Sequence, residues 1–208
     1  MARLIPLLIF STAFGYIEAA VVVYLREIFY PGGFSFPLKP FSPGLLVTEI
    51  VREAATIILL ACAAFISAKR ISERISFFLF CFAVWDITYY LWLKVLLNWP
   101  ASIFEWDILF LIPVPWTSPV FAPVIVSLTL ILWAILILRL GTNMEKLKFS
   151  LLNIFLVVIS SLIIFLTFIW NLPEVVGGAI PKNYPWLLFA FGVFISFLAI
   201  LNFARENK

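Results

Sequence analysis

Long, uninterrupted runs of apolar residues dominate the chain, and they do not alternate with polar positions in the two-residue period typical of half-buried strands. A helix needs about 20 residues to cross the hydrocarbon core of a bilayer. The runs of that length predict six membrane-spanning helices, at Leu4–Leu25, Leu45–Ser67, Ile75–Leu97, Val120–Leu140, Leu151–Trp170 and Trp186–Phe203.

The segment from Asn98 to Pro119 does not fit this pattern. It is too short and too rich in proline to span a bilayer, yet it is too apolar to lie wholly in water. It therefore predicts an interfacial or re-entrant segment that covers the outer face of the bundle between the third and fourth spans. The alternative is an ordinary aromatic belt at the interface, with Glu105 and Asp107 in water.

The overall composition agrees with a membrane protein. Of the 208 residues, 64% are hydrophobic and 12% are charged, whereas soluble domains are roughly 45–50% apolar and about 25% charged. Backbone polar groups in lipid must be satisfied internally, and continuous apolar runs favour helices over a barrel. We expect an all-α, polytopic integral membrane protein in which residues 1–208 form a single transmembrane domain of six helices.

The basic residues predict the orientation. One side of the predicted bundle carries Arg3, Lys69, Arg70, Arg74, Arg139, Lys146, Lys148, Arg205 and Lys208, and the other carries only Arg26, Lys39 and Lys182. Cytoplasmic loops are enriched in lysine and arginine, so we expect both termini in the cytoplasm and a multi-pass protein of the plasma (inner) membrane. The net charge of +3 then encodes orientation and does not indicate binding to nucleic acid.

The N-terminal segment allows a second interpretation. Arg3, a short apolar core and the small residues around Ala13-Phe14-Gly15 are also features of a cleaved signal peptide. The apolar run continues through Ala19–Val23, however, and this favours an uncleaved first span.

The last three predicted spans carry no charge near the middle of the membrane, so the charged residues expected at membrane depth are confined to the first three. They are Glu18, Glu49, Arg52, Glu53, Asp86 and Lys94, and all are expected at or beyond the middle of the membrane on the extracytoplasmic side. Charged groups at membrane depth cost several kcal/mol, face the bundle interior and mark candidate functional sites.

Helical spacing gathers these residues into a predicted pocket. Glu49 and Glu53 are four residues apart on one helix face, with Arg52 on its flank, and Asp86 and Tyr90 have the same spacing. We expect Glu18, Glu49, Glu53, Asp86 and Tyr90 to line the pocket, Arg52 and Lys94 to be their partners, and Asp107 to join from the loop above. The alternative is a polar lock, in which the two cations neutralise carboxylates and fix the packing of the helices.

The residue types limit the chemistry. The chain has no histidine, which excludes b-type haem with histidine ligands and histidine-ligated zinc. Cys62 and Cys81 both fall in predicted spans and do not suggest a disulfide framework. Carboxylates suit a hard divalent cation, for which Glu49, Glu53 and Asp86 are the candidate ligands. They also suit organic cations and protons.

Three functional hypotheses follow. The first is binding, with or without transport, of a cation or small solute in the extracytoplasmic pocket. The second is an enzyme acting on a lipid or lipid-linked substrate, with Glu53 or Asp86 as acid or base and Arg52 holding an anionic group. The third is an accessory subunit that contacts partner proteins through its last three spans, which carry no mid-membrane charge. No nucleophile, zinc or phosphate-binding motif decides between them.

Overall fold

A computed structural model describes residues 3–141 and 147–207 of the chain. It contains six helices that are long and apolar enough to cross a membrane. They are α1 (Leu4–Phe29), α2 (Pro43–Ser67), α3 (Ile71–Leu97), α4 (Phe121–Gly141), α5 (Leu151–Phe168) and α7 (Trp186–Glu206). A short helix, α6 (Leu172–Val176), follows α5. The prediction of a multi-pass helical membrane protein is confirmed.

Local sequence explains where several helices begin and end. Ser42 and Ser150 cap the starts of α2 and α5, because their hydroxyls accept hydrogen bonds from the backbone N–H groups of Leu45 and Asn153. Pro43 occupies the first turn of α2, where a missing N–H does no harm. Asn98 ends α3 in the left-handed conformation, with a φ of 52°.

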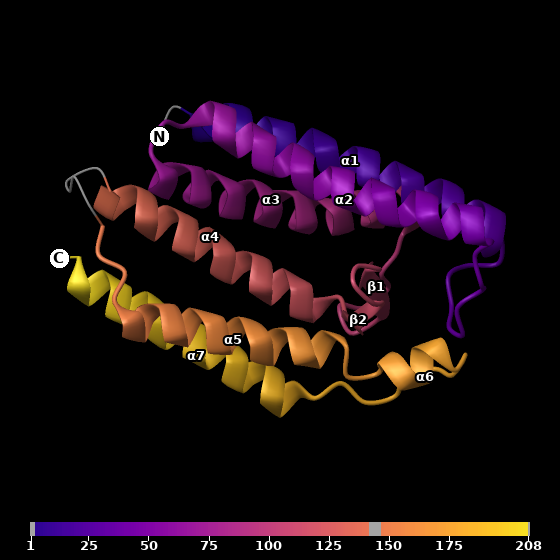
Figure 1. Cartoon of the computed structure of the whole chain (residues 1–208). Coiled ribbons are helices and arrows are strands. Elements are labelled where there is room, and N and C mark those ends of the chain that lie inside the picture. Colours follow the sequence, from indigo (N-terminus) through magenta and orange to yellow (C-terminus); the bar gives the residue numbers. More distant parts are fainter. Residues whose placement is uncertain (1–2, 142–146, 208) are drawn as a thin grey trace.

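The helices form two groups (Figure 1). In the first, α3 packs against α1, α2 and α4, and in the second α5 packs against α7. Helix α4 connects the groups because it also contacts α7. Glycine permits a close approach of α1 and α3 at one point: a β-carbon added at Gly15 of α1 would lie only 2.5 Å from Thr88 Oγ1 of α3.

The two ends of the bundle differ. Helix α1 begins and α7 ends at the same end, which we call the basic end because Arg3, Arg70, Arg74 and Arg205 lie there (Figure 1). The opposite end carries the connections of residues 30–42, 98–120 and 169–185, and we call it the loop end. Side chains such as Ile66, Leu151 and Leu187 are more than 85% exposed, as expected of residues that face lipid.

The segment between α3 and α4 contains a β-hairpin, so the all-α description needs one correction. Strands β1 (Trp106–Phe110) and β2 (Trp116–Pro119) pair antiparallel, with Asp107 opposite Ser118. The sequence did not suggest strands, because each run is short and the prolines that bound the turn also suit an irregular loop.

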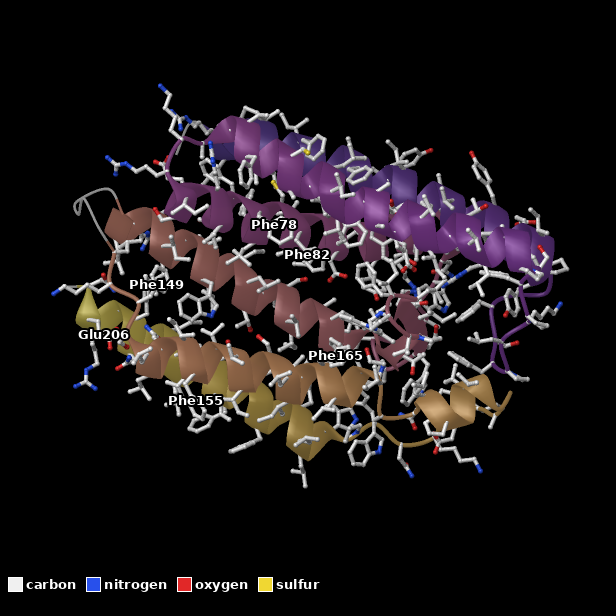
Figure 2. All side chains as sticks on the ribbon, viewed as in Figure 1. Phe78, Phe82, Phe149, Phe155, Phe165 and Glu206 are labelled. Carbon is white, nitrogen blue, oxygen red and sulfur yellow. The ribbon has the colours of Figure 1, made fainter. Side chains whose placement is uncertain are left out.

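The hairpin is tucked between the two helix groups (Figure 1). The ring of Phe110 stacks on Phe82 in the central turns of α3, with 6.3 Å between ring centroids. On the other side, Trp116 packs edge-on against Phe165 of α5 at 5.0 Å, and Figure 2 labels Phe82 on α3 and Phe165 on α5. The hairpin thus extends from the loop end into the bundle, as far as the central turns of α3.

Candidate functional site

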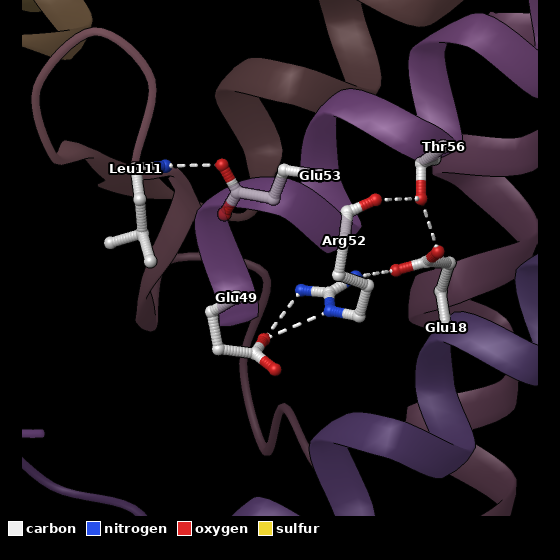
Figure 3. A network of polar contacts seen from close by, with 6 residues as sticks. All are labelled: Glu18, Glu49, Arg52, Glu53, Thr56 and Leu111. Carbon is white, nitrogen blue, oxygen red and sulfur yellow. Dashed lines mark hydrogen bonds and ion pairs between the residues drawn. The ribbon is translucent and has the colours of Figure 1, made fainter. Parts of the chain in front are cut away.

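A buried ion network joins α1 to α2 (Figure 3). The guanidinium of Arg52 forms ion pairs with Glu18 of α1 and with Glu49 of its own helix, the latter at 2.8 Å. Both carboxylates are at most 5% exposed. The Thr56 hydroxyl donates to the other oxygen of Glu18 at 2.5 Å. One cation therefore neutralises part of the charge of two carboxylates.

Glu53 lies one turn beyond Glu49 on α2, and it has a different partner. Its Oε2 accepts a hydrogen bond from the backbone N–H of Leu111, at the tip of the hairpin, at 2.8 Å (Figure 3). The side chain is 7% exposed, and among the described residues no lysine or arginine forms an ion pair with it. Its second oxygen makes no hydrogen bond with that part of the chain. Within the described residues, Glu53 is thus a buried carboxyl that forms no ion pair.

Asp86 of α3 is a second acid without an ion-pair partner among the described residues, and it is partly buried. Its Oδ2 accepts a hydrogen bond from the hydroxyl of Ser127 on α4 at 2.8 Å. Glu53 and Asp86 line the same small cavity, of about 70 Å³. A water molecule needs about 10–15 Å³ of such volume, so the cavity has room for several waters or for one small polar group.

A second ion pair joins α1 to the hairpin. Arg26 and Asp107 are 3.3 Å apart, and each is at most 7% exposed. The guanidinium of Arg26 also lies over the rings of Phe34 and Trp99, at 4.4 and 3.8 Å from their centroids. Burial raises the pKa of Asp107 to about 6, although the positive charge of Arg26 limits the rise.

A wide cavity of about 660 Å³ lies next to the small one, on the side of the loop end. The two cavities share Val22, Arg52, Glu53, Tyr89 and Ile108 in their linings, so they are neighbours. The remaining lining of the wide cavity comes from the outer end of α1, the loop that follows it, the outer turns of α2, the hairpin, and α6 with the two glycines after it. Its volume falls within the ~300–1,000 Å³ range of small-molecule sites.

The structure brings most of the predicted site residues together. Glu18, Arg52, Glu53, Asp86 and Tyr90 line the small cavity, and Glu49 and Asp107 line the wide one. Lys94 does not join them. Its Nζ donates to the carbonyl oxygens of Asn98 and Pro100, at 3.3 and 2.9 Å, and so it caps the end of its own helix.

Sequence reasoning missed several partners. Arg26 was assigned to a loop, although it lies eight residues after Glu18 and therefore on the same face of a helix that is one turn longer than expected. The hydroxyls of Thr56 and Ser127 were missed because serine and threonine are common in membrane helices. The backbone N–H of Leu111 gives no signal in a sequence.

The geometry does not favour Glu49, Glu53 and Asp86 as a metal-ligand set. Across the part of the chain that the structure describes, no group of three or more aspartate, glutamate or cysteine side chains is placed to hold a metal ion. These three carboxyls instead have separate partners, in Arg52, Leu111 and Ser127.

Comparisons with protein-family models, with curated proteins and with solved structures found no match to this chain.

Proposed function

We propose that this membrane protein binds a small organic cation that enters from the extracytoplasmic side. One observation carries the proposal: Glu53 and Asp86 line a single small cavity and have no ion-pair partner among the described residues. The other buried acids of the site are compensated, since Glu18 and Glu49 share Arg52, and Asp107 pairs with Arg26.

An ammonium group complements this arrangement. An ionised carboxylate away from water is costly unless it is paired, and a cation between Glu53 and Asp86 would provide the missing partner. The rings of Trp85, Tyr89 and Tyr90 also line the cavity, and aromatic faces attract ammonium groups. This lining supports an organic cation over a bare metal ion.

The direction of entry follows from the proposed orientation. The basic end carries most of the lysines and arginines, so it faces the cytoplasm by the positive-inside rule. The loop end then faces the extracytoplasmic side of the plasma (inner) membrane, and the wide cavity leads from that side toward Glu53. Cysteines introduced at Lys39 and Lys69 test this, because an impermeant maleimide added to intact cells should label only the first.

We also propose that the hairpin is a re-entrant element that holds Glu53 in place. Its tip lies beside the central turns of α3, and its strands satisfy each other's backbone groups, as membrane depth requires. The N–H of Leu111 fixes one oxygen of Glu53 and leaves the other available to a ligand.

Calorimetric titration of the purified protein in lipid nanodiscs with ethylamine hydrochloride tests the binding function. Binding should be lost in Glu53→Gln and Asp86→Asn, since both substitutions remove a negative charge and keep the side-chain shape. Glu27→Gln is the matched control, because Glu27 is an exposed acid at the outer end of α1. Equal ethylamine affinities in all four proteins, or no binding to the native chain, would show that the buried charges only lock the helices together.

A further inference from the structure

The wide cavity has a graded lining. Near the loop end its wall is mainly apolar and aromatic, with side chains that include Tyr30, Phe34, Leu38, Phe41 and Leu46. At its deep end it reaches Glu53 and borders the small cavity. A ligand that fills both cavities therefore meets apolar surface first and a buried carboxyl last.

The unpaired charges also differ between the two ends of this cavity. Two of its three lining cations, Arg26 and Arg52, already have carboxylate partners. The third, Lys39, lies in the loop after α1 with its Nζ 5.4 Å from the centroid of the Tyr30 ring, and it forms no ion pair with a described residue. The unpaired carboxyl is deep, whereas the unpaired cation belongs to the outer loop.

We infer that the ligand is an amphiphilic monoamine, with one ammonium group at Glu53 and Asp86 and an apolar, preferably aromatic, body along the wall formed by Tyr30, Phe41 and Leu46. This inference rests on the proposed function, because it assigns the body of the same organic cation. The apolar wall supplies a favourable surface for the body, since the removal of apolar area from water favours binding in proportion to the area buried.

Lys39 restricts the class of ligand further, to amines with one ammonium group. Glu53 is the eleventh residue of α2, so it lies roughly 15 Å along the helix axis from the outer end of α2, near the loop that carries Lys39. A second ammonium at the far end of a ligand would approach Lys39 and be repelled. The cavity therefore selects monoamines over diamines of similar length.

Four soluble probes separate these features: 2-phenylethylamine, ethylamine, 3-phenylpropionate and 1,10-diaminodecane, whose two ammonium groups are far enough apart to reach from Glu53 to the loop that carries Lys39. Each is titrated calorimetrically into the protein in nanodiscs, with empty nanodiscs as the blank for partitioning into lipid. We expect 2-phenylethylamine to bind about 10-fold or more tightly than ethylamine, because its ring buries additional apolar area. The anion should not bind, and the diamine should bind no better than ethylamine despite its longer apolar chain, because its second ammonium approaches Lys39.

A substitution that blocks the wide cavity tests whether the apolar body of the ligand lies there. Leu46→Trp fills the wide cavity and should abolish the advantage of 2-phenylethylamine while leaving ethylamine binding unchanged. Val47→Trp is the matched control, since the neighbouring Val47 is 59% exposed and does not line the cavity. Lys39→Gln should improve the binding of 1,10-diaminodecane, because the cation that repels its second ammonium is removed.

The outcomes distinguish the inference from the function beneath it. If ethylamine and 2-phenylethylamine bind equally, and both are lost in Glu53→Gln, the cation site stands and the amphiphilic body is wrong. If the advantage of 2-phenylethylamine persists in Leu46→Trp, the body lies elsewhere and the inference is also wrong. If neither amine binds to the native protein, the proposed function fails and the inference falls with it.

Discussion

The backbone N–H of Leu111 donates to the carboxylate of Glu53 at 2.8 Å, across 58 positions of sequence. This contact is made by a hairpin that follows α3 and by a side chain in the middle of α2. It links the position of the hairpin to Glu53. This buried residue lines both cavities and forms no ion pair with a described residue. Substitutions at Glu53 should therefore change the local stability of the hairpin.

Removing the Glu53 acceptor should loosen the hairpin. A hydrogen bond to a charged group contributes about 1.5–3 kcal/mol, so in Glu53→Ala we expect amide hydrogen exchange in residues 106–116 to accelerate about 10- to 100-fold. Glu53→Gln keeps a neutral acceptor and should have a smaller effect. Hydrogen exchange followed by mass spectrometry measures both.

The control for this series is Glu27→Ala, which removes an exposed acid that forms no hydrogen bond or ion pair with the hairpin. Unchanged exchange at residues 106–116 in Glu53→Ala would show that ring packing by Phe110 and Trp116 is sufficient to hold the hairpin.

Arg52 should be the most important single charge for stability. Arg52→Gln leaves Glu18 and Glu49 buried without their common cation, and breaking a buried ion pair typically costs about 3–5 kcal/mol. We expect a marked fall in the temperature of unfolding in detergent micelles. Adding Glu18→Gln and Glu49→Gln to this variant should recover much of the loss, because no unpaired charge then remains in the network.

Arg3→Gln provides the comparison for Arg52. Arg3 forms a long 3.9 Å pair with Glu73, and its side chain is 61% exposed, so its loss should cost at most about 1 kcal/mol. An Arg52 variant as stable as Arg3→Gln would mean that water reaches the network and screens its charges.

The helices could be predicted from the sequence because each span must satisfy its own backbone in lipid, and the necessary apolar length is visible in one chain segment. The acids of the pocket were also visible, since Glu49 and Glu53 share a face by spacing alone. Their partners depend on how helices meet. Nothing in the sequence shows that Glu18 of α1 would pair with Arg52 of α2, or that Asp86 would find Ser127 of α4.

Lys94 is a residue that the sequence placed in the site and the structure does not. Its depth in a predicted span suggested a partner for the carboxylates, but a long flexible side chain near a helix end can reach polar groups at the interface. In the structure it turns to the carbonyl oxygens that follow α3. The hairpin was missed for a related reason, because its stability comes from aromatic packing with α3 and α5 and not from local strand signals.

The contact between α1 and α3 should be intolerant of side-chain volume at Gly15. A β-carbon there would lie 2.5 Å from Thr88 Oγ1 and 3.1 Å from the backbone oxygen of Trp85. We expect Gly15→Ala to destabilise the protein by about 1–3 kcal/mol, the usual cost of overpacking. Gly44→Ala is the control, since no atom lies within 4 Å of a β-carbon at that position. Thermal unfolding in micelles compares the two, and Thr88→Ala should partly rescue the first.

The carboxyl of Asp107 should titrate near pH 6, well above the usual value of about 3.9 for aspartate. Burial favours its protonated form, so the folded protein holds this proton more tightly than an unfolded chain does. Its contribution to stability is therefore largest below about pH 4 and declines as the pH rises from there to about 6. Infrared difference spectroscopy of the protonated carboxyl stretch, assigned by its loss in Asp107→Asn, measures the titration.

Arg26 provides the decisive variant for this titration. Its positive charge, 3.3 Å from Asp107, lowers the pKa of the acid and opposes the effect of burial. In Arg26→Gln that opposition is lost, so the midpoint should move above pH 6. Lys39→Gln is the control: it also removes a cation from the wide cavity, but one that is not paired with Asp107. A midpoint that stays the same or falls in Arg26→Gln would show that water, and not the guanidinium, sets the charge of Asp107. The ion pair between α1 and the hairpin would then have little influence on the site.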